Sequence, residues 1–355
     1  MNLFLKIILL PFSMIYGIGI IFRNIFYDLK IIRSYAFPTP LICVGNINTG
    51  GTGKTPAIEY IIRTLLENNI TNLFTLSRGY GRKTKGYILA DSKSTAELIG
   101  DEPLQFFLKF PEIQVAVCEK RAQGIHKILN KFPSTQCILL DDAYQHRAVR
   151  AGLNILLTVY DNLYSNDLIL PSGRLREFRS AAKRAKIIIV TKCPANISET
   201  KKDEIIKRLK PEPHQKILFS SIKYLPPVAV NTEMMHKYTD LKEVFVLLFS
   251  GIANPEPLEK YLNQNCKTLF SLRFKDHHVY SEKDMDLISG KFLNIVSENK
   301  IIITTEKDYS RLCTEKTFDK YRNLPLFYIP VEMEFQEKDK IFFNQTLLDY
   351  VRKNQ

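Results

Sequence analysis

A glycine-rich segment near the start of the chain has the residue types that bind nucleotide phosphates. Residues 46–55 read NINTGGTGKT, between an expected strand at Leu41–Gly45 and an expected helix from Thr55. In such a loop the backbone N–H groups and the helix N-terminus surround the phosphates, the lysine faces the β- and γ-phosphates, and the last hydroxyl binds magnesium. The usual pattern has glycine where Asn48 stands, and we expect the glycine pair in mid-loop to make the turn instead. The expected nucleotide-binding residues are Asn48, Thr49, Gly50, Gly51, Thr52, Gly53, Lys54 and Thr55.

A second segment supplies carboxylates for a metal ion. The apolar run Cys137–Leu140 ends in Asp141 and Asp142, the pattern of a strand with acids at its tip. A carboxylate in this position reaches the magnesium ion of a bound nucleotide, directly or through water. We therefore expect ATP or GTP with Mg²⁺, and a metal site built from Thr55, Asp141 and Asp142, without distinguishing which aspartate contacts the ion.

Two acidic motifs are candidates for the chemistry that uses this nucleotide. Asp101 stands before a short apolar helix, where it is either an ordinary helix cap or a base that takes the proton of an acceptor hydroxyl. The loop Asp276–His278 holds two adjacent histidines, which are either surface residues or partners of that base. No further ligand cluster supports a transition-metal site there. The chain also lacks an Asn-Lys-x-Asp loop, which argues against a switch GTPase.

The charge balance indicates an anionic partner. The chain of 355 residues has 50 Lys and Arg against 37 Asp and Glu, a net charge of +13. Such an excess suits nucleic acid or a phosphate-bearing membrane surface. Positive charge concentrates in residues 77–86 and 173–186, but no groove-entering or base-stacking element is evident, so we expect a membrane surface and no nucleic acid. Six cysteines without a C-x-x-C pair indicate reduced thiols.

The N-terminal segment favours the membrane. Residues Leu3–Phe22 carry a single charge, Lys6. A helix of this length is about 30 Å long, the thickness of the hydrocarbon layer. Arg23, Lys30 and Arg33 follow, which places this end in the cytoplasm by the positive-inside rule. A proline and two glycines within the run leave open whether the helix spans the membrane or lies in its interface.

The remaining sequence predicts an α/β fold. Short apolar strands alternate with amphipathic helices, as in a parallel sheet covered on both faces. The expected strands are Leu41–Gly45, Leu73–Leu76, Val115–Cys118, Cys137–Leu140, Ile155–Val159, Ile187–Val190, Ile217–Ser220, Val244–Phe249, Ile301–Thr304 and Leu326–Ile329. Irregular sequence at 225–240 suggests a junction. We therefore expect an anchor at residues 1–35, a P-loop nucleotide-binding domain at 36–228, and a smaller C-terminal α/β domain at 229–355 that closes a cleft.

With these residues in view, the chain resembles the tetraacyldisaccharide 4'-kinases, the lipid A 4'-kinases of Gram-negative bacteria. The resemblance runs through nearly the whole length, in motifs that keep the family order. They are VGNINTGGTGKTP (44–56), SRGYGR (77–82), GDEP (100–103), DDAYQHR (141–147), LPSGRLRE (170–177), SGIANPE (250–256), DHH (276–278) and TEKD (305–308). Ala143 stands where the family has glycine, a mild departure within a turn.

This resemblance implies a kinase at the cytoplasmic face of the bacterial inner membrane. It would move the γ-phosphate of ATP to the 4'-hydroxyl of a tetraacylated glucosamine disaccharide 1-phosphate, an anionic glycolipid, without an obligate protein partner. The resemblance assigns the catalytic base to Asp101 and its partner to His277, with His278 as the alternative. It also implies a set of substrate-cleft residues, namely Tyr80, Arg82, Arg121, Gln145 and Glu177.

Two other functions fit the motifs less fully. A membrane-anchored P-loop ATPase or switch that acts on a protein partner would turn over nucleotide without phosphorylating a lipid. A nucleic-acid-dependent ATPase would be stimulated by DNA or RNA and would show a steep salt dependence.

Overall fold

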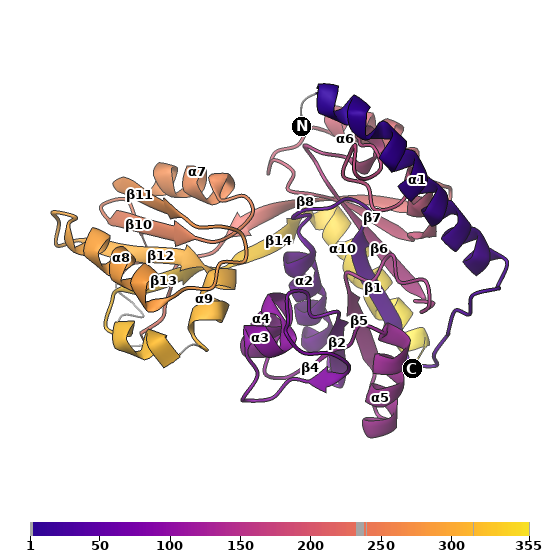
Figure 1. The fold of residues 1–355 in the computed structure, drawn as a ribbon, viewed down its shortest axis with the longest axis horizontal. Helices are drawn as coiled ribbons and strands as arrows, with labels where there is room; N and C mark the ends of the chain where they lie inside the picture. Colours follow the sequence, from indigo (N-terminus) through magenta and orange to yellow (C-terminus); the bar gives the residue numbers. More distant parts are fainter. Residues whose placement is uncertain (1–2, 232–237, 239, 315, 355) are drawn as a thin grey trace.

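The computed structural model describes residues 3–231, 238, 240–314 and 316–354, which form two sheets with helices on both faces (Figure 1). The larger sheet of this described part has the strand order β14-β8-β7-β6-β1-β5-β2-β4-β3. Its strands are β1 (Leu41–Asn46), β2 (Leu73–Ser77), β3 (Ile88–Leu89), β4 (Gln114–Val117), β5 (Cys137–Asp141), β6 (Leu153–Val159), β7 (Ile187–Thr191), β8 (Lys216–Tyr224) and β14 (Val331–Phe335). Neighbouring strands are parallel except at the edges, where β3 and β14 are antiparallel.

Helices cover both faces of the larger sheet because its central strands are apolar on both sides. All six residues of β1 are buried. One face is covered by α2 (Lys54–Glu67), α4 (Asp101–Lys109) and α10 (Glu337–Lys353), and the short α3 (Ala96–Ile99) precedes α4. The other face is covered by α5 (Arg121–Lys131), α6 (Glu199–Leu209) and the 3-10 turn η2 (Arg179–Arg184).

The smaller sheet has the order β11-β10-β12-β13-β9. Its strands are β9 (Val228–Ala229), β10 (Phe245–Ser250), β11 (Thr268–Arg273), β12 (Lys300–Thr305) and β13 (Leu326–Ile329). The helices α7 (Glu256–Asn265) and α8 (Glu282–Leu293) pack on its opposite faces. The helix α9 (Glu306–Leu312) follows β12 and packs against α4 of the larger unit.

The α/β class and the mostly parallel sheets are confirmed, but the C-terminal segment differs from the predicted boundary. We predicted residues 229–355 to form the second domain, whereas β14 and α10 join the larger sheet. The physical reason is burial, because Met333 and Phe335 enter the core of the larger sheet. Figure 1 shows β8 and β14 side by side where the two units meet. Within the predicted junction at 225–240, residues 232–237 and 239 lie outside the described residues.

The N-terminal helix α1 (Leu3–Asp28) lies along the larger unit (Figure 1). Ser13 Oγ donates to Ser172 Oγ at 2.8 Å, and the Tyr16 hydroxyl donates to the carbonyl of Arg176 at 3.1 Å. A Cβ on Gly17 would lie 2.8 Å from the end of the Phe178 ring, so the absence of a side chain here lets the ring pack closely against the helix. Most of the apolar side chains of α1 are exposed, and the helix is long and apolar enough to cross a membrane.

Candidate active site

The phosphate-binding loop lies between β1 and α2, at the carboxyl edge of the larger sheet. Gly50 and Gly53 have φ values of 106° and 84°, the left-handed region that favours glycine. Asn46 Nδ2 donates to Thr52 Oγ1 at 2.8 Å, and Thr191 Oγ1 donates to the carbonyl of Thr52 at 2.9 Å. These bonds from β1 and β7, two strands of the same sheet, hold the loop in shape, so its backbone N–H groups are organised before a nucleotide arrives.

Asn48, at the position where the P-loop pattern has glycine, is buried. Its amide nitrogen and oxygen have no hydrogen-bond partner among the described residues. The next backbone N–H, of Thr49, donates to the carbonyl of Arg174 at 2.7 Å. The side chain of Asn48 is therefore enclosed by protein, and its contact with nucleotide stays a prediction.

The expected metal-binding acids lie beside this loop because β5 is the direct neighbour of β1. Asp141 pairs in register with Val44. Asp142 Oδ2 lies 3.9 Å from Lys54 Nζ and 3.1 Å from Arg176 Nη1. Asp141 Oδ1 is buried without a protein partner in the described chain. Burial, reinforced by the charge of Asp142, raises the pKa of Asp141 to about 7. A buried carboxylate oxygen without a partner is suited to a cation.

The candidate base is held by side chains of the second unit. Asp101 is the first residue of α4, and its Oδ2 accepts hydrogen bonds from His277 Nδ1 at 2.6 Å and Arg311 Nη2 at 2.8 Å. Burial opposes ionisation of this carboxyl, but the bonds from His277 and Arg311 outweigh burial and hold the pKa of Asp101 well below its usual range. His278 points elsewhere, to Asp284 Oδ2 at 3.1 Å, so the structure pairs His277 with Asp101.

Two motifs of the second unit form a cradle around these contacts. Asp308 Oδ1 accepts from Arg311 Nη1 at 2.9 Å, and its Oδ2 accepts from the backbone N–H of Gly251 at 3.1 Å. The carbonyl of Gly251 accepts from both the His277 backbone N–H and Arg311 Nη1, each at 3.1 Å. His277 has φ of 59°, a conformation that is strained for a residue other than glycine. The surrounding hydrogen bonds stabilise this conformation, and it directs the ring toward Asp101.

Ion pairs also join α9 to the larger unit. Lys307 Nζ donates to Glu102 Oε1 at 2.7 Å. Lys109 Nζ lies 2.7 Å from both Glu59 on α2 and Glu306 on α9. One ammonium group, that of Lys109, therefore connects three helices: α2, which starts at the phosphate-binding loop, α4, which carries Asp101, and α9, which carries Arg311.

The residues predicted to line the substrate cleft fall into two groups. Tyr80 is 71% exposed, and its ring centroid lies 5.7 Å from that of His277. The other four have internal partners: Arg82 with Glu119, Arg121 with the carbonyls of Cys118 and Asp141, Gln145 with the carbonyl of Asn46, and Glu177 with Arg23 and Arg184. Arg82, Arg121 and Glu177 are buried, so in this structure they hold loops in place and do not face a ligand.

The sequence interpretation missed two side chains that the structure brings to the site. Arg311 lies three residues after Asp308, one helical turn beyond the TEKD motif, and that spacing was the available signal. Arg176 lies in the basic run and in the LPSGRLRE motif but was assigned no role from sequence; in the structure it bonds to Asp142 and, at 3.0 Å, to Asn46 Oδ1.

Known proteins resemble this chain in sequence and in fold. A family model described as tetraacyldisaccharide-1-P 4'-kinase matches residues 5–351. A tetraacyldisaccharide 4'-kinase of Flavobacterium johnsoniae is 45% identical and covers 100% of this chain and 99% of its own. The corresponding protein of Bacteroides thetaiotaomicron is 42% identical over 98% of this chain and 93% of its own. A crystal structure of LpxK from Aquifex aeolicus, described as an apo form in complex with ATP, superposes with a TM-score of 0.72 at 27% identity, covering 98% of this chain and 99% of that one. A match of this extent, in sequence and in fold, means that the chain belongs to the tetraacyldisaccharide-1-P 4'-kinase family.

Proposed function

We propose that this chain transfers the γ-phosphate of ATP to the 4'-hydroxyl of a tetraacylated glucosamine disaccharide 1-phosphate, with Asp101 as the base. The proposal depends on the pairing of Asp101 with His277 across the two units, and the organised phosphate-binding loop supports it. Phosphoryl transfer needs little covalent chemistry from a protein, so positioning and charge stabilisation are the main requirements.

The nucleotide phosphates bind at the loop between β1 and α2. The backbone N–H groups of this loop and the N-terminus of α2 bind the phosphate oxygens, and Lys54 contacts the β- and γ-phosphates. Lys192 Nζ lies 3.9 Å from the position of a Cβ on Gly51, so a second ammonium group is close to the same phosphates. ATP is supported by the similar structure described with this nucleotide.

The site has a suitable place for magnesium. Thr55 and the aspartates at the end of β5 supply oxygen ligands, and the unpartnered Asp141 Oδ1 is the atom that most needs a cation. The ion would neutralise charge on the β- and γ-phosphates. Asp142 is held by Lys54 and Arg176, which keeps its carboxylate directed toward the loop.

Asp101 accepts the proton of the sugar hydroxyl through its second oxygen. Its Oδ2 is occupied by His277 and Arg311, whereas Oδ1 has no hydrogen-bond partner in the described part of the chain. Arg311 and His277 fix the plane of the carboxylate, so Oδ1 faces a constant direction. A change in the separation of the two units would make or break these contacts, because both donors come from the second unit.

The acceptor reaches this site from a membrane. We propose that α1 lies in the interface, because the hydrogen bonds of Ser13 and Tyr16 hold one side of the helix along the protein. The exposed apolar side then enters the acyl region of the bilayer. The location that follows is the cytoplasmic face of the bacterial inner membrane, where ATP is present.

A transfer assay tests the proposed function. The full chain is incubated with γ-labelled ATP, magnesium and the tetraacyldisaccharide 1-phosphate in detergent micelles, beside the Lys54→Ala and Asp101→Asn variants. We expect label at the 4'-position with the wild-type chain, and a loss of about 10²- to 10⁴-fold in Asp101→Asn with nucleotide binding retained. ATP consumption without labelled lipid would refute the kinase and favour the partner-acting ATPase. Near-full transfer by Asp101→Asn would refute the base assignment alone.

A further inference from the structure

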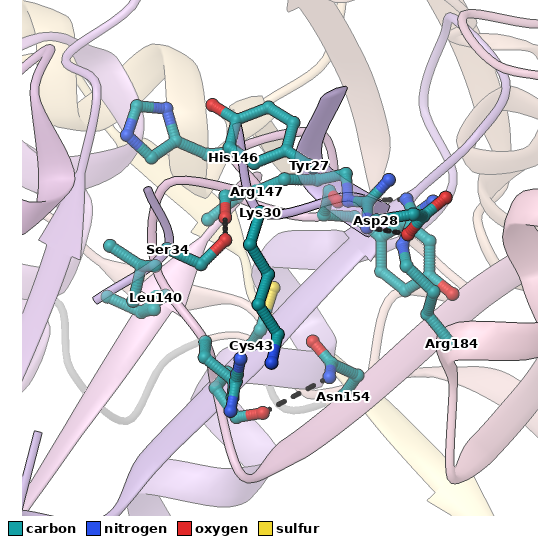
Figure 2. A pocket seen from close by; sticks show the side chains of 15 residues that line it. Tyr27, Asp28, Lys30, Ser34, Cys43, Leu140, His146, Arg147, Asn154 and Arg184 are labelled. Carbon is teal, nitrogen blue, oxygen red and sulfur yellow. Dashed lines mark hydrogen bonds and ion pairs between the residues drawn. The ribbon is translucent and has the colours of Figure 1, made fainter. Parts of the chain in front are cut away.

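A basic pocket lies away from the phosphate-binding loop, beside the C-terminal end of α1. Its volume is about 260 Å³, and Figure 2 shows the side chains that line it. Cys43 in mid-β1 and Asn154 in β6 contribute to the lining, so the pocket lies over the sheet face that α5 and α6 cover. A second cavity of about 250 Å³ shares Tyr27, Lys30 and other residues of this wall.

Cations outnumber anions in this pocket. Its lining contains Lys30, Arg147, Arg150 and Arg184, with Asp28 as the single carboxylate. The other titratable groups add no negative charge, because burial raises the pKa of the Cys43 thiol to about 12. Burial and nearby arginines lower the pKa of His146 to about 4, so its ring is neutral at pH 7.

Two of the four cations have acidic partners and two do not. Arg147 pairs with Asp28 and lies 5.2 Å from the Tyr27 ring centroid. Arg184 pairs with Glu177. In contrast, Lys30 and Arg150 make no ion pair or side-chain hydrogen bond with any described residue, although the Lys30 side chain points into the pocket (Figure 2).

The pocket wall is built by contacts that do not depend on a ligand. Arg147 Nη1 donates to the carbonyl of Asn24 at 3.0 Å, which holds the end of α1 against the loop after β5. The backbone of Tyr35 exchanges hydrogen bonds of 2.9 and 2.8 Å with Ala148 and Arg150. Ser34 Oγ donates to the carbonyl of Arg147 at 2.6 Å. These contacts fix the chain on both sides of Lys30, so the cavity exists in the free protein.

We propose that this pocket binds the phosphate group of a membrane lipid. The inference rests on the membrane location proposed above, because the exposed apolar side of α1 ends at Phe26, four residues before Lys30. A lipid whose acyl chains lie against this end of α1 therefore has its phosphate close to the pocket, which Tyr27 and Lys30 line. Phosphate oxygens accept hydrogen bonds from ammonium and guanidinium groups, and a phosphate would supply the acceptors that Lys30 and Arg150 lack. The phosphate belongs either to an anionic phospholipid or to the acceptor glycolipid itself.

The first arm of the test measures binding to vesicles. The full chain with Lys30→Gln and Arg150→Gln is sedimented with phosphatidylcholine vesicles that contain 20% phosphatidylglycerol (roughly the anionic content at which such electrostatic binding is measurable). The matched control carries Lys338→Gln and Lys340→Gln, two exposed lysines on α10, which covers the opposite face of the sheet. Both variants lose two positive charges, so a general effect of net charge cancels.

We expect the pocket variant to bind these vesicles roughly 20-fold more weakly than wild type, and the control to change by less than about threefold. On pure phosphatidylcholine the two variants should bind alike. A Lys30→Arg variant retains the cation and should bind nearly as wild type does. A melting temperature for each variant shows whether it is folded.

The second arm distinguishes the two sources of phosphate. Transfer kinetics are measured in neutral detergent micelles without phospholipid. A KM for the acceptor that rises at least fivefold in the pocket variant, with kcat retained, assigns the pocket to the phosphate of the acceptor (about 1 kcal/mol of binding free energy). An unchanged KM together with weaker vesicle binding assigns it to an anionic phospholipid. A pocket variant that matches the control in both arms would overturn the proposal. A wild-type chain that binds vesicles normally but does not phosphorylate the acceptor lipid would refute the proposed function instead.

Discussion

The two donors on Asp101 Oδ2 lead to a prediction about the pH dependence of transfer. His277→Ala removes one donor, and Arg311→Lys weakens the other, because lysine cannot bridge Asp101 and Asp308 as the planar guanidinium does. We expect the lysine to stay with Asp308, which is fully buried, because leaving that charge unpaired would cost more. Asp101 then keeps neither of its strong hydrogen bonds in the double variant.

The size of the effect follows from these two hydrogen bonds. A hydrogen bond to a charged group contributes about 1.5–3 kcal/mol, which corresponds to about 1–2 pKa units. Burial alone raises the pKa of Asp101, and in the wild-type chain it is opposed by His277 and Arg311. When neither donor is present, burial is unopposed and the pKa of Asp101 rises above its usual range. A base must be ionised to accept a proton, so activity falls on the acid side, between about pH 4 and 6.

The assay is the pH profile of kcat for labelled phosphoryl transfer, measured for wild type, both single variants and the double variant. We expect no acid limb from Asp101 in the wild-type profile above about pH 5, and one that appears in the double variant with a kcat roughly 100-fold lower. The KM for ATP should be unchanged, because the P-loop is intact. If the double variant kept the wild-type profile, and the two single effects on kcat simply multiplied, the two donors would not act through one carboxylate oxygen.

Three further predictions concern stability, membrane binding and nucleotide affinity. Burial raises the pKa of Glu59 to about 7, despite the bond from Lys109, so its stabilising contribution is present below about pH 4.5 and is lost as the pH rises through 7. Glu59→Gln should therefore become more stable relative to wild type as the pH rises from 5 to 8, and an equal difference in melting temperature at both pH values would contradict this. Ile15→Glu places a charge on the exposed side of α1 and should release the chain from vesicles without lowering its melting temperature, whereas Val296→Glu, at another exposed apolar residue, should not. Lys192→Ala should raise the KM for ATP several-fold with little change in kcat, and an unchanged KM would remove Lys192 from the nucleotide site.

The bounds of strands that consist of a continuous apolar run could be predicted to within a residue or two. The strand at Leu326–Ile329 has the predicted bounds, and Cys137–Leu140 is extended by one residue. These strands are continuous apolar runs, and their burial on both faces leaves little ambiguity. In contrast, β11 was missed because its residues are half exposed in an edge strand. The pairing of β14 with β8 was also missed, because it joins segments more than a hundred residues apart.

The sequence by itself determined the phosphate-binding loop, the acids at the end of β5 and the apolar N-terminal helix, because each depends on the order of neighbouring residues. Only the tertiary structure decided that His277 and not His278 contacts Asp101, since the loop conformation at positive φ sets the direction of each ring. The same holds for Arg311, whose contacts with Asp101 join two units that are distant in sequence. The burial of Arg82, Arg121 and Glu177 could also not be predicted from the sequence, because a charged side chain in a motif can face either a ligand or an internal partner.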